Sequence, residues 1–260
     1  MKRVLITGGP TNEFIDEVMK ITNMSSGRFA VELADYFVDA GYQVTLLLTK
    51  GIKHHRLDPL SYRPNFSLVR FETTAELLQK IELCASSAEY DIIVHSAAVA
   101  DYKPEFSFRA EDMADEIAEY VCTNALNSQV STNDLRDGIF KILTNPECKV
   151  NDDTKISSVE PNLTVKLGLT PKIIASLRQY FPNAYICGFK LLENVPEQAL
   201  VDAAMKQLQK CNTNIVFAND LAELRKGNYA RLVVTPDGYH GIKVDGALGV
   251  FKLLRIVTSE

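Results

Sequence analysis

The sequence predicts an α/β fold with a mostly parallel, doubly wound sheet, one long insertion and a C-terminal hairpin. Two observations predict it: short β-rich runs alternate with stretches of helical periodicity, and several strands are continuous apolar runs. The first strand, 2–7, ends in a glycine turn; a helix from Ser25 to Ala40 ends at Gly41, and a second buried strand covers 42–49. A strand, a helix and a strand in this order form a right-handed parallel crossover.

The same alternation continues along the chain. A short strand at 69–71, a helix at 74–83 and a buried strand at 91–96 follow. Residues 104–154 break the pattern with acidic, Asn and Ser clusters, so we expect a long insertion there, partly helical around 111–124. The remaining elements are predicted at 162–167, 171–179, 185–189, 197–210 and 214–218, with a hairpin that pairs 231–235 with 240–244.

Length and composition are those of one globular domain. The 260 residues can bury one large core, and 46% hydrophobic with 23% charged residues is an ordinary globular balance. We therefore expect a single domain over 1–260 that carries the insertion. No apolar run reaches the roughly 18 residues of a membrane span, and Met1-Lys2-Arg3 leads into a strand without a signal-peptide core. These features predict a cytoplasmic protein with no membrane partner.

The net charge and the use of cysteine and histidine argue against several other classes of protein. A net charge of −5 argues against a nucleic-acid partner, because binding many phosphates needs a basic face. The five cysteines include no C-x-x-C pair and are expected to be reduced packing residues. The four histidines lack the H-E-x-x-H spacing, so no metal-binding residues are predicted. His95, inside an apolar strand, is interpreted as a hydrogen-bonded core histidine rather than a catalytic base.

The turn after the first strand is the first candidate binding feature. Gly8 and Gly9 lie where an open α/β sheet places its ligands, and glycines let backbone amides approach a phosphate. A glycine turn can also simply reverse the chain. The turn is not a G-x-G-x-x-G fingerprint, and the second strand ends in Thr49-Lys50 rather than in an acidic residue. Both features weaken a nicotinamide-cofactor hypothesis, and NAD is disfavoured more than NADP.

The segment 21–28 is the second candidate. Ser26 and Gly27 precede the first long helix, whose amino terminus favours an anion through its free amides and its dipole. Ordinary N-capping explains the same residues. Asn23 lies about one turn before that cap, and its side-chain amide offers two donors and one acceptor, which suits an acyl-phosphate group.

Two further groups of residues are candidates for ligand binding. Ala97 and Asp101 follow the strand at 91–96, where small side chains leave room for a flat ligand; helix packing and capping are the alternative. Lys206 and Lys210 are four residues apart on one helical face and could neutralise a triphosphate. Lysines late in a helix also stabilise its dipole without binding any ligand.

Taken in order, these segments resemble the phosphopantothenoylcysteine synthetases, also called phosphopantothenate-cysteine ligases, in their stand-alone form. The resemblance covers nearly the whole chain. It rests on GGPTNEFID (8–16), ITNMSSGRFA (21–30), AAVADY (97–102), KISS (155–158), the pair Gly188-Phe189, and Lys206 and Lys210 before NIVFAND (214–220).

The resemblance implies a Rossmann-like fold, a homodimer and a two-step, Mg²⁺-dependent reaction of coenzyme A biosynthesis. The carboxylate of 4′-phosphopantothenate attacks the α-phosphorus of a nucleoside triphosphate, and L-cysteine then displaces the nucleoside monophosphate. The cosubstrate is CTP or ATP, and we expect CTP. The flavin-dependent decarboxylase domain of the bifunctional members is absent from this sequence, so a separate decarboxylase is expected to act next.

The resemblance also implies roles for individual residues. Catalytic roles fall to Asn23, which binds the acyl-nucleotidylate, and to Lys155, on a loop that closes over the nucleotide. Nucleotide-binding roles fall to Gly8, Gly9, Ser26, Gly27, Ala97, Asp101, Pro171, Phe189, Lys206 and Lys210. Where bifunctional members often carry an arginine, this chain has Met19 with Lys20 beside it. Lys20 is expected to replace that cation.

Two alternative functions stay open from the residues themselves. An NADP-dependent Rossmann oxidoreductase would need a Tyr-x-x-x-Lys pair, yet Tyr102 is followed four residues later by Phe106. A non-catalytic nucleotide-binding module would bind nucleotide without releasing pyrophosphate.

Overall fold

The computed structural model describes residues 1–125, 130–150, 156–157, 159 and 161–259. The chain forms two compact units. The first contains Met1–Thr11, Asn23–Ala100 and Pro171–Glu260, and the second contains Asn12–Thr22 and Asp101–Thr170. The second unit includes most of the expected insertion together with a short hairpin from the amino-terminal region. A single ligase domain over 1–260 stays a prediction, because one active domain can be built of two compact units.

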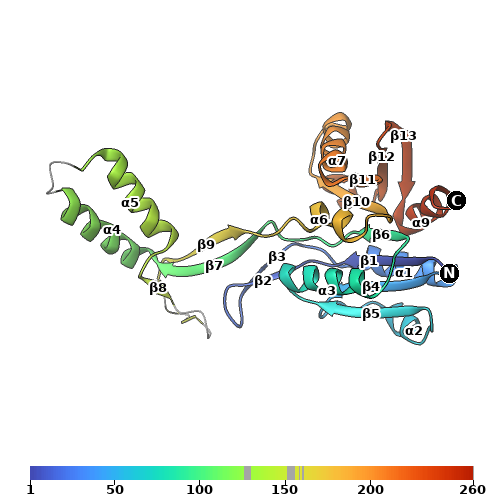
Figure 1. Ribbon diagram of the computed structural model, residues 1–260, viewed down its shortest axis with the longest axis horizontal. Coiled ribbons are helices and arrows are strands. Elements are labelled where there is room, and N and C mark those ends of the chain that lie inside the picture. Colours follow the sequence, from blue (N-terminus) through green and yellow to red (C-terminus); the bar gives the residue numbers. More distant parts are fainter. Residues whose placement is uncertain (126–129, 151–155, 158, 160, 260) are drawn as a thin grey trace. The chain divides into compact units, whose positions relative to one another are not determined.

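The first unit is built on an eight-stranded sheet (Figure 1). Its strand order is β13-β12-β11-β10-β6-β1-β4-β5, in which the six strands from β11 to β5 are parallel and β12 and β13 are antiparallel. The predicted Rossmann-like, mostly parallel doubly wound sheet with a C-terminal hairpin is thereby confirmed. The strands are β1 (Arg3–Gly8), β4 (Gln43–Thr49), β5 (Phe66–Phe71), β6 (Ile92–His95), β10 (Tyr185–Leu192), β11 (Ile215–Asp220), β12 (Ala230–Thr235) and β13 (Gly238–Asp245).

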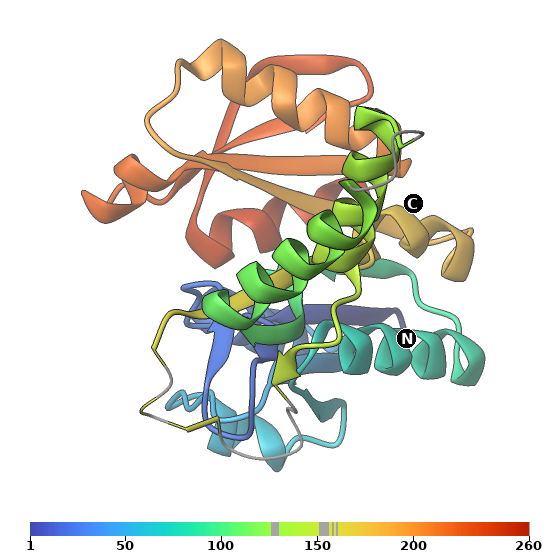
Figure 2. The ribbon, with the colours of Figure 1, turned by 90° about the vertical axis from the view of Figure 1, so that its left-hand side faces the viewer.

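Helices cover both faces of this sheet. On one face, α1 (Arg28–Asp39) and α9 (Gly246–Val257) pack against alternate residues of the strands, such as Ile6, Leu46 and Phe217. On the other face lie α3 (Thr74–Ser87), α6 (Ile173–Tyr180) and α7 (Glu197–Cys211). Figure 2 shows α7 and α9 on opposite sides of the strands between them. The short helices α2 (Leu57–Ser61) and α8 (Leu221–Arg225) complete the unit.

Helix α9 is the main element of this unit that the sequence did not predict. The predicted hairpin ended at Val244, yet Asp245 and Gly246 turn the chain into a helix. Its buried residues recur at helical spacing, and they are Ala247, Val250, Phe251 and Leu254. Phe251 packs against Phe37 of α1, with their ring centroids 5.0 Å apart. The sheet face beside α1 is therefore closed by the carboxyl-terminal helix.

The second unit contains two small sheets and a helical pair. β2 (Asn12–Phe14) and β3 (Lys20–Thr22) form a hairpin, and β7 (Tyr102–Arg109) pairs with both β8 (Lys149–Val150) and β9 (Leu163–Leu169). α4 (Ala110–Ala125) and α5 (Thr132–Thr144) follow β7 (Figure 1). Buried side chains of Phe106, Phe108 and Met113 form its core.

The insertion is more regular than the sequence predicted. The helix expected around 111–124 is confirmed as α4, whereas β7 and α5 were missed. The strand predicted at 162–167 exists as β9, but it pairs antiparallel with β7 and does not join the main sheet. Four of the eight residues of β7 are exposed, so the strand lacks the apolar run that marks a buried one.

None of the helices in the described ranges is long and apolar enough to cross a membrane.

Candidate functional site

The candidate site lies where the sheet reverses its winding order. β1 and β6 are neighbours at the centre of the sheet, and the chain leaves them toward opposite edges, to β4 and to β10. Their following loops run side by side: the backbone N–H of Ala98 donates to the carbonyl of Gly9 at 2.9 Å, and that of Thr11 donates to the carbonyl of Ala98 at 3.3 Å. Open α/β sheets bind their ligands at this switch point.

Three buried threonines hold these loops in place, and sequence reasoning did not single them out. The hydroxyl of Thr7 accepts from the N–H of Ala97 at 3.2 Å, and that of Thr11 accepts from the N–H of Ala100 at 2.9 Å. The hydroxyl of Thr49, at the end of β4, donates to the carbonyls of Gly8 and Pro10. Their common signal is a threonine in or just after a strand end. The loops are thus fixed by buried threonine side chains.

The glycines of the first loop are required by close packing. A Cβ on Gly8 would lie 2.2 Å from the Cβ of Ala30 in α1. Gly9 has a φ of +83°, and a Cβ there would lie 2.4 Å from the hydroxyl of Thr49. Gly27 has a φ of +68°, and a Cβ added there would lie 3.4 Å from the Cα of Gly9. The amino terminus of α1 therefore lies directly against the loop after β1.

Asn23 joins the same cluster. Its side-chain Nδ2 donates to the carbonyl of Ala98 at 3.2 Å and to that of Val99 at 3.0 Å. Four predicted site features are thus brought together at one edge of the sheet: the Gly8-Gly9 turn, Asn23, Gly27 and Ala97. Asn23 is exposed, and Ala97 is half-buried. A ligand on this edge can reach both.

His95 ends β6 beneath this edge and is a core histidine, as the sequence predicted. Only 6% of it is exposed, and burial lowers its pKa to about 4. Its Nδ1 lies 2.9 Å from the hydroxyl of Thr7. Because that hydroxyl already accepts from Ala97, its proton is available to His95. The imidazole is neutral at physiological pH and supports the loop.

The first turn of α1 offers a place for an anion. Its N-cap residue Gly27 has no side chain to cap the helix, and the hydroxyl of Ser26 accepts from the N–H of Arg28 at 3.4 Å. Exposed backbone donors and the helix dipole favour negative charge at this position. Phe189, half-buried in β10, lies against this turn with its ring 5.1 Å from that of Phe29.

The other predicted residues that the structure describes lie on other elements of the chain. Lys206 and Lys210 are exposed on α7, and Lys210 lies in the last turn of that helix, where its charge favours the dipole. Pro171 is exposed and is the residue at which the chain returns to the first unit after Thr170. Asp101 belongs to the second unit, where its carbonyl accepts from the N–H of Thr170. Lys155 lies outside the described residues.

In the second unit, Asp16 organises the segment that contains Met19 and Lys20. Its Oδ1 accepts from the N–H groups of Val18 and Met19 at 2.7 and 2.6 Å, and its Oδ2 accepts from that of Ile156 at 3.0 Å. Lys20, the cation expected to replace the family arginine, is exposed on β3. Asp16 therefore connects the 16–20 turn with the beginning of the described part of the KISS segment.

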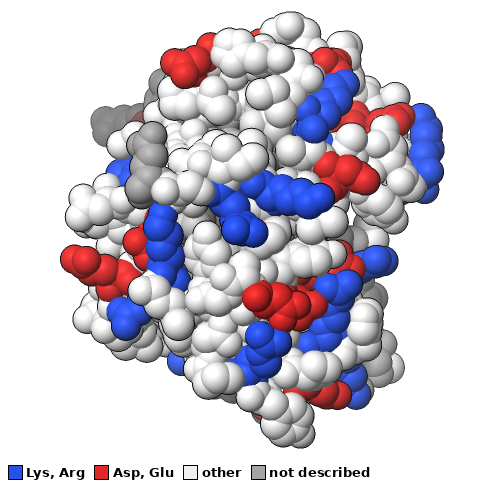
Figure 3. Space-filling view, turned by 90° about the vertical axis from the view of Figure 1, so that its right-hand side faces the viewer, with Lys and Arg blue, Asp and Glu red and all other residues white. Residues whose placement is uncertain are grey.

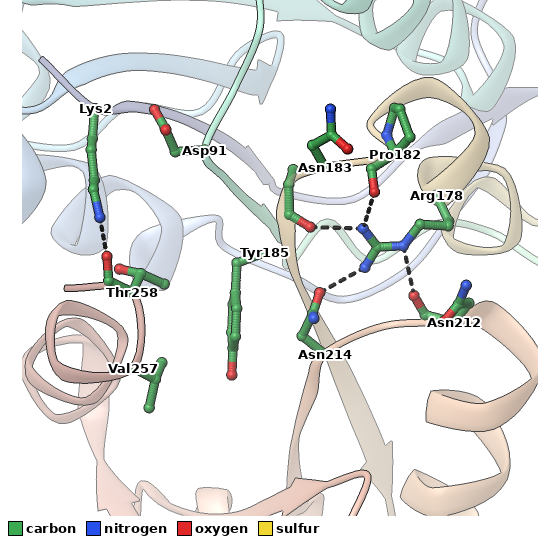
Figure 4. A pocket seen from close by; sticks show the side chains of 11 residues that line it. Lys2, Asp91, Arg178, Pro182, Asn183, Tyr185, Asn212, Asn214, Val257 and Thr258 are labelled. Carbon is green, nitrogen blue, oxygen red and sulfur yellow. Dashed lines mark hydrogen bonds between the residues drawn. The ribbon is translucent and has the colours of Figure 1, made fainter. Parts of the chain in front are cut away.

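A cavity of about 620 Å³ lies at the opposite, amino-terminal edge of the main sheet (Figure 4). Its central side chain, Arg178, donates to the carbonyls of Ala184 and Asn212 at 2.8 and 3.1 Å and to Oδ1 of Asn214 at 2.7 Å. These bonds tie α6 to the starts of β10 and β11. Arg178 is therefore a structural residue rather than a ligand-binding one.

Charge on the surface is mixed. Figure 3 shows lysine and arginine side chains interspersed with acidic ones on one face of the molecule. Among the described residues, no group of three His, Cys, Asp or Glu side chains could hold a metal ion. The candidate site is an edge lined by the backbone of two loops and by the amino terminus of α1.

The fold defines a Rossmann-like protein whose candidate site lies at the switch point of the sheet. Residues 1–118 match the model of the DNA/pantothenate metabolism flavoprotein C-terminal domain. The coenzyme A biosynthesis bifunctional protein CoaBC of Thermococcus kodakarensis is 31% identical over 222 residues, which are 85% of this chain and 41% of that protein. The chain thus spans about two fifths of the length of this curated relative.

Two solved structures have the same fold. The DNA/pantothenate metabolism flavoprotein from Streptococcus pneumoniae aligns over 100% of both chains with a TM-score of 0.75 and 27% identity. A Cab2 variant in complex with phosphopantothenate-cysteine aligns over 99% of this chain and 85% of its own, with a TM-score of 0.63 and 18% identity. The resemblance to the phosphopantothenoylcysteine synthetases is confirmed.

Replacing Gly9 with alanine should destabilise the protein more than replacing Gly41. Both glycines have positive φ, +83° and +84°, so each alanine carries the same backbone cost of roughly 1–2 kcal/mol. Only the Cβ at position 9 meets a neighbour, the Thr49 hydroxyl, whereas position 41 is open. Denaturant unfolding of Gly9→Ala and Gly41→Ala measures the difference. Equal losses would contradict the close packing of this loop.

His95 should make the protein less stable as pH falls from 6.5 toward 4. In that range the unfolded histidine takes up a proton and the buried one, with its pKa lowered to about 4, does not. The contribution of His95 to the free energy of unfolding is full above pH 6.5. It decreases by about 3 kcal/mol as the pH falls toward 4. The measurement is the free energy of unfolding against pH for wild type and for His95→Gln. Parallel curves would show that the pKa of His95 in the folded protein is not lowered.

Proposed function

We propose that the chain is a ligase of coenzyme A biosynthesis that joins 4′-phosphopantothenate and L-cysteine through an acyl-nucleotidylate. The proposal is supported by the similarity to CoaBC along most of the chain and by the fold shared with pantothenate-metabolism structures. The observation that carries it is the position of Asn23. The residue that the resemblance makes catalytic is bonded to the loop after β6 and lies beside the glycine turn after β1.

The first step is nucleotidyl transfer to the carboxylate. An oxygen of the 4′-phosphopantothenate carboxylate forms a bond to the α-phosphorus of the Mg²⁺-bound nucleoside triphosphate. The bond from the α-phosphorus to the bridging oxygen breaks, and pyrophosphate leaves with that electron pair. Since both reactants are anionic, the site must hold them together against repulsion. The amides at Gly8 and Gly9 and the first turn of α1 would supply this attraction.

The second step forms the amide. The amine of cysteine attacks the acyl carbon, the carbon–oxygen bond to the nucleotide breaks, and the nucleoside monophosphate leaves as the amine loses a proton. No protein nucleophile takes part. The protein's contribution is to orient the mixed anhydride and to exclude water until cysteine arrives. Asn23 would hold the loop at Ala98 and Val99 rigid and contact the intermediate.

The remaining assignments are part of the same proposal. Phe189, beside the first turn of α1, would contact the base, and Asp101 would contact the ribose. Lys155, Lys206 and Lys210 would supply positive charge to the triphosphate, with Lys155 on a closing loop. We propose CTP as the cosubstrate, with ATP as the alternative, and a homodimer as the active form.

The deciding experiment is pyrophosphate release by the purified chain with Mg²⁺ and each of the four nucleoside triphosphates in turn. We expect release with CTP or ATP only when 4′-phosphopantothenate is present, and amide product only after cysteine is added. With ¹⁸O in the carboxylate, one label should appear in the nucleoside monophosphate. Nucleotide binding without pyrophosphate release would identify a non-catalytic module instead.

Asn23→Asp should abolish most activity while the protein stays folded. The new carboxylate cannot donate to the carbonyls of Ala98 and Val99, and it repels an anionic intermediate. Because Asn23 is exposed, the loss of stability should be about 1 kcal/mol, whereas turnover should fall about a hundredfold or more. The measurements are steady-state turnover and thermal unfolding.

Asn183→Asp is the matched control for this variant. It introduces the same charge at an exposed asparagine of the amino-terminal edge, so turnover should stay at the wild-type level. Wild-type turnover in Asn23→Asp would remove Asn23 from the mechanism.

A further inference from the structure

A second cavity of the first unit lies beside the first turn of α1. It measures about 790 Å³ and is bordered by α1, the start of β12 and the first two turns of α9. Phe29, Tyr36 and Leu248 give it apolar walls, and Arg28, Arg231 and Lys252 bring cations to it. Its size is that of pockets that bind small organic molecules.

Arg231 is the central residue of this cavity. Only 8% of the side chain is exposed, and its guanidinium carbon lies 4.4 Å from the ring centroid of Phe29. Nη1 donates to the carbonyl of Tyr229 at 3.0 Å, whereas the buried Nε has no hydrogen-bond partner. A buried cation with an unmade donor is costly unless an anion satisfies it.

The charged residues that line the cavity favour the binding of one anion. The cavity is lined by three cations, Arg28, Arg231 and Lys252, and by two acidic residues, Glu32 and Asp245. Arg28 is paired with Glu32 at 2.7 Å, so that pair contributes little net charge. Asp245 offsets the charge of only one of the two remaining cations, Arg231 and Lys252. The lining therefore carries one excess positive charge.

The amino terminus of α9 adds to this attraction. Residues 245–249, which form the N-cap and first turn of this twelve-residue helix, line the cavity, and Asp245 makes no capping bond with its side chain. The positive end of the helix dipole therefore points to the same space as Arg231. Two independent features, a buried arginine with an unused donor and a helix amino terminus, favour an oxyanion here.

We propose that this cavity binds a small organic phosphate, with its phosphoryl group at Arg231 and the start of α9 and its organic part against Phe29 and Tyr36. The cavity adjoins the proposed reaction site, because Ser26 and the first turn of α1 border both. Burial lowers the pKa of Arg231, and the nearby charge of Asp245 opposes that lowering, so Asp245 competes with the ligand for this arginine. Removing the charge of Arg231 should therefore weaken binding of the phosphate, and removing the charge of Asp245 should strengthen it.

The test is calorimetric titration of the full chain with phenyl phosphate, inorganic phosphate and phenol, without nucleotide. We expect phenyl phosphate to bind more tightly than inorganic phosphate and phenol not to bind. Arg231→Gln should weaken phenyl phosphate binding about tenfold or more, and Asp245→Asn should strengthen it. Arg255→Gln, at an exposed arginine of α9 outside the cavity, should change nothing.

Two further controls separate loss of phosphate binding from loss of folding and from loss of ligase activity. Arg231→Leu should unfold at or above the wild-type temperature without ligand, and phenyl phosphate should no longer stabilise it. If the Arg231 variants do not fold, Asp245→Asn still tests the site, because it keeps Arg231. Asn23→Asp should bind phenyl phosphate like wild type even where ligase activity is lost. No binding to wild type, or equal affinity in folded Arg231→Gln, would overturn the proposal.

Discussion

The candidate site depends on the backbone pairing of two loops at the switch point, the loop after β1 and the loop after β6. The N–H of Ala98 donates to the carbonyl of Gly9, and the N–H of Thr11 returns a bond to Ala98. This continues the β1–β6 ladder beyond the strands and fixes the backbone before any ligand arrives. Asn23 then bonds to the second loop, and Gly27 packs on the first. A preorganised backbone of this kind can stabilise charge without rearranging.

Much of the first unit could be predicted from the sequence because its signals are local. Buried parallel strands such as β4 are apolar runs, and α1 and α7 show helical periodicity and their own terminal residues. The missed elements lack such signals. β7 is half exposed and exists through pairing with β9, which is more than fifty residues away in sequence. α9 follows a hairpin directly, and its apolar face was not recognised beyond Val244.

The candidate site was predicted by position but not in its supporting contacts. The location of Gly8, Asn23 and Ala97 follows from the rule that parallel strands end at one edge. Thr7, Thr11 and Thr49 were missed because a threonine in a strand is ordinary, and only the fold shows that all three bond to the loops. A triphosphate contact of Lys206 and Lys210 was inferred from their spacing and from the family resemblance. Spacing places Lys206 and Lys210 on one helical face, yet it cannot show where that face lies.

The most direct test of this account is a crystal structure of the chain with Mg²⁺, 4′-phosphopantothenate and a CTP analogue whose α,β-bridging oxygen is replaced by a methylene group. The account predicts phosphate oxygens bonded to backbone amides of the Gly8-Gly9 turn or the first turn of α1, with the carboxylate beside Asn23 and the α-phosphorus. A nucleotide bound at the amino-terminal edge beside Arg178 would contradict it.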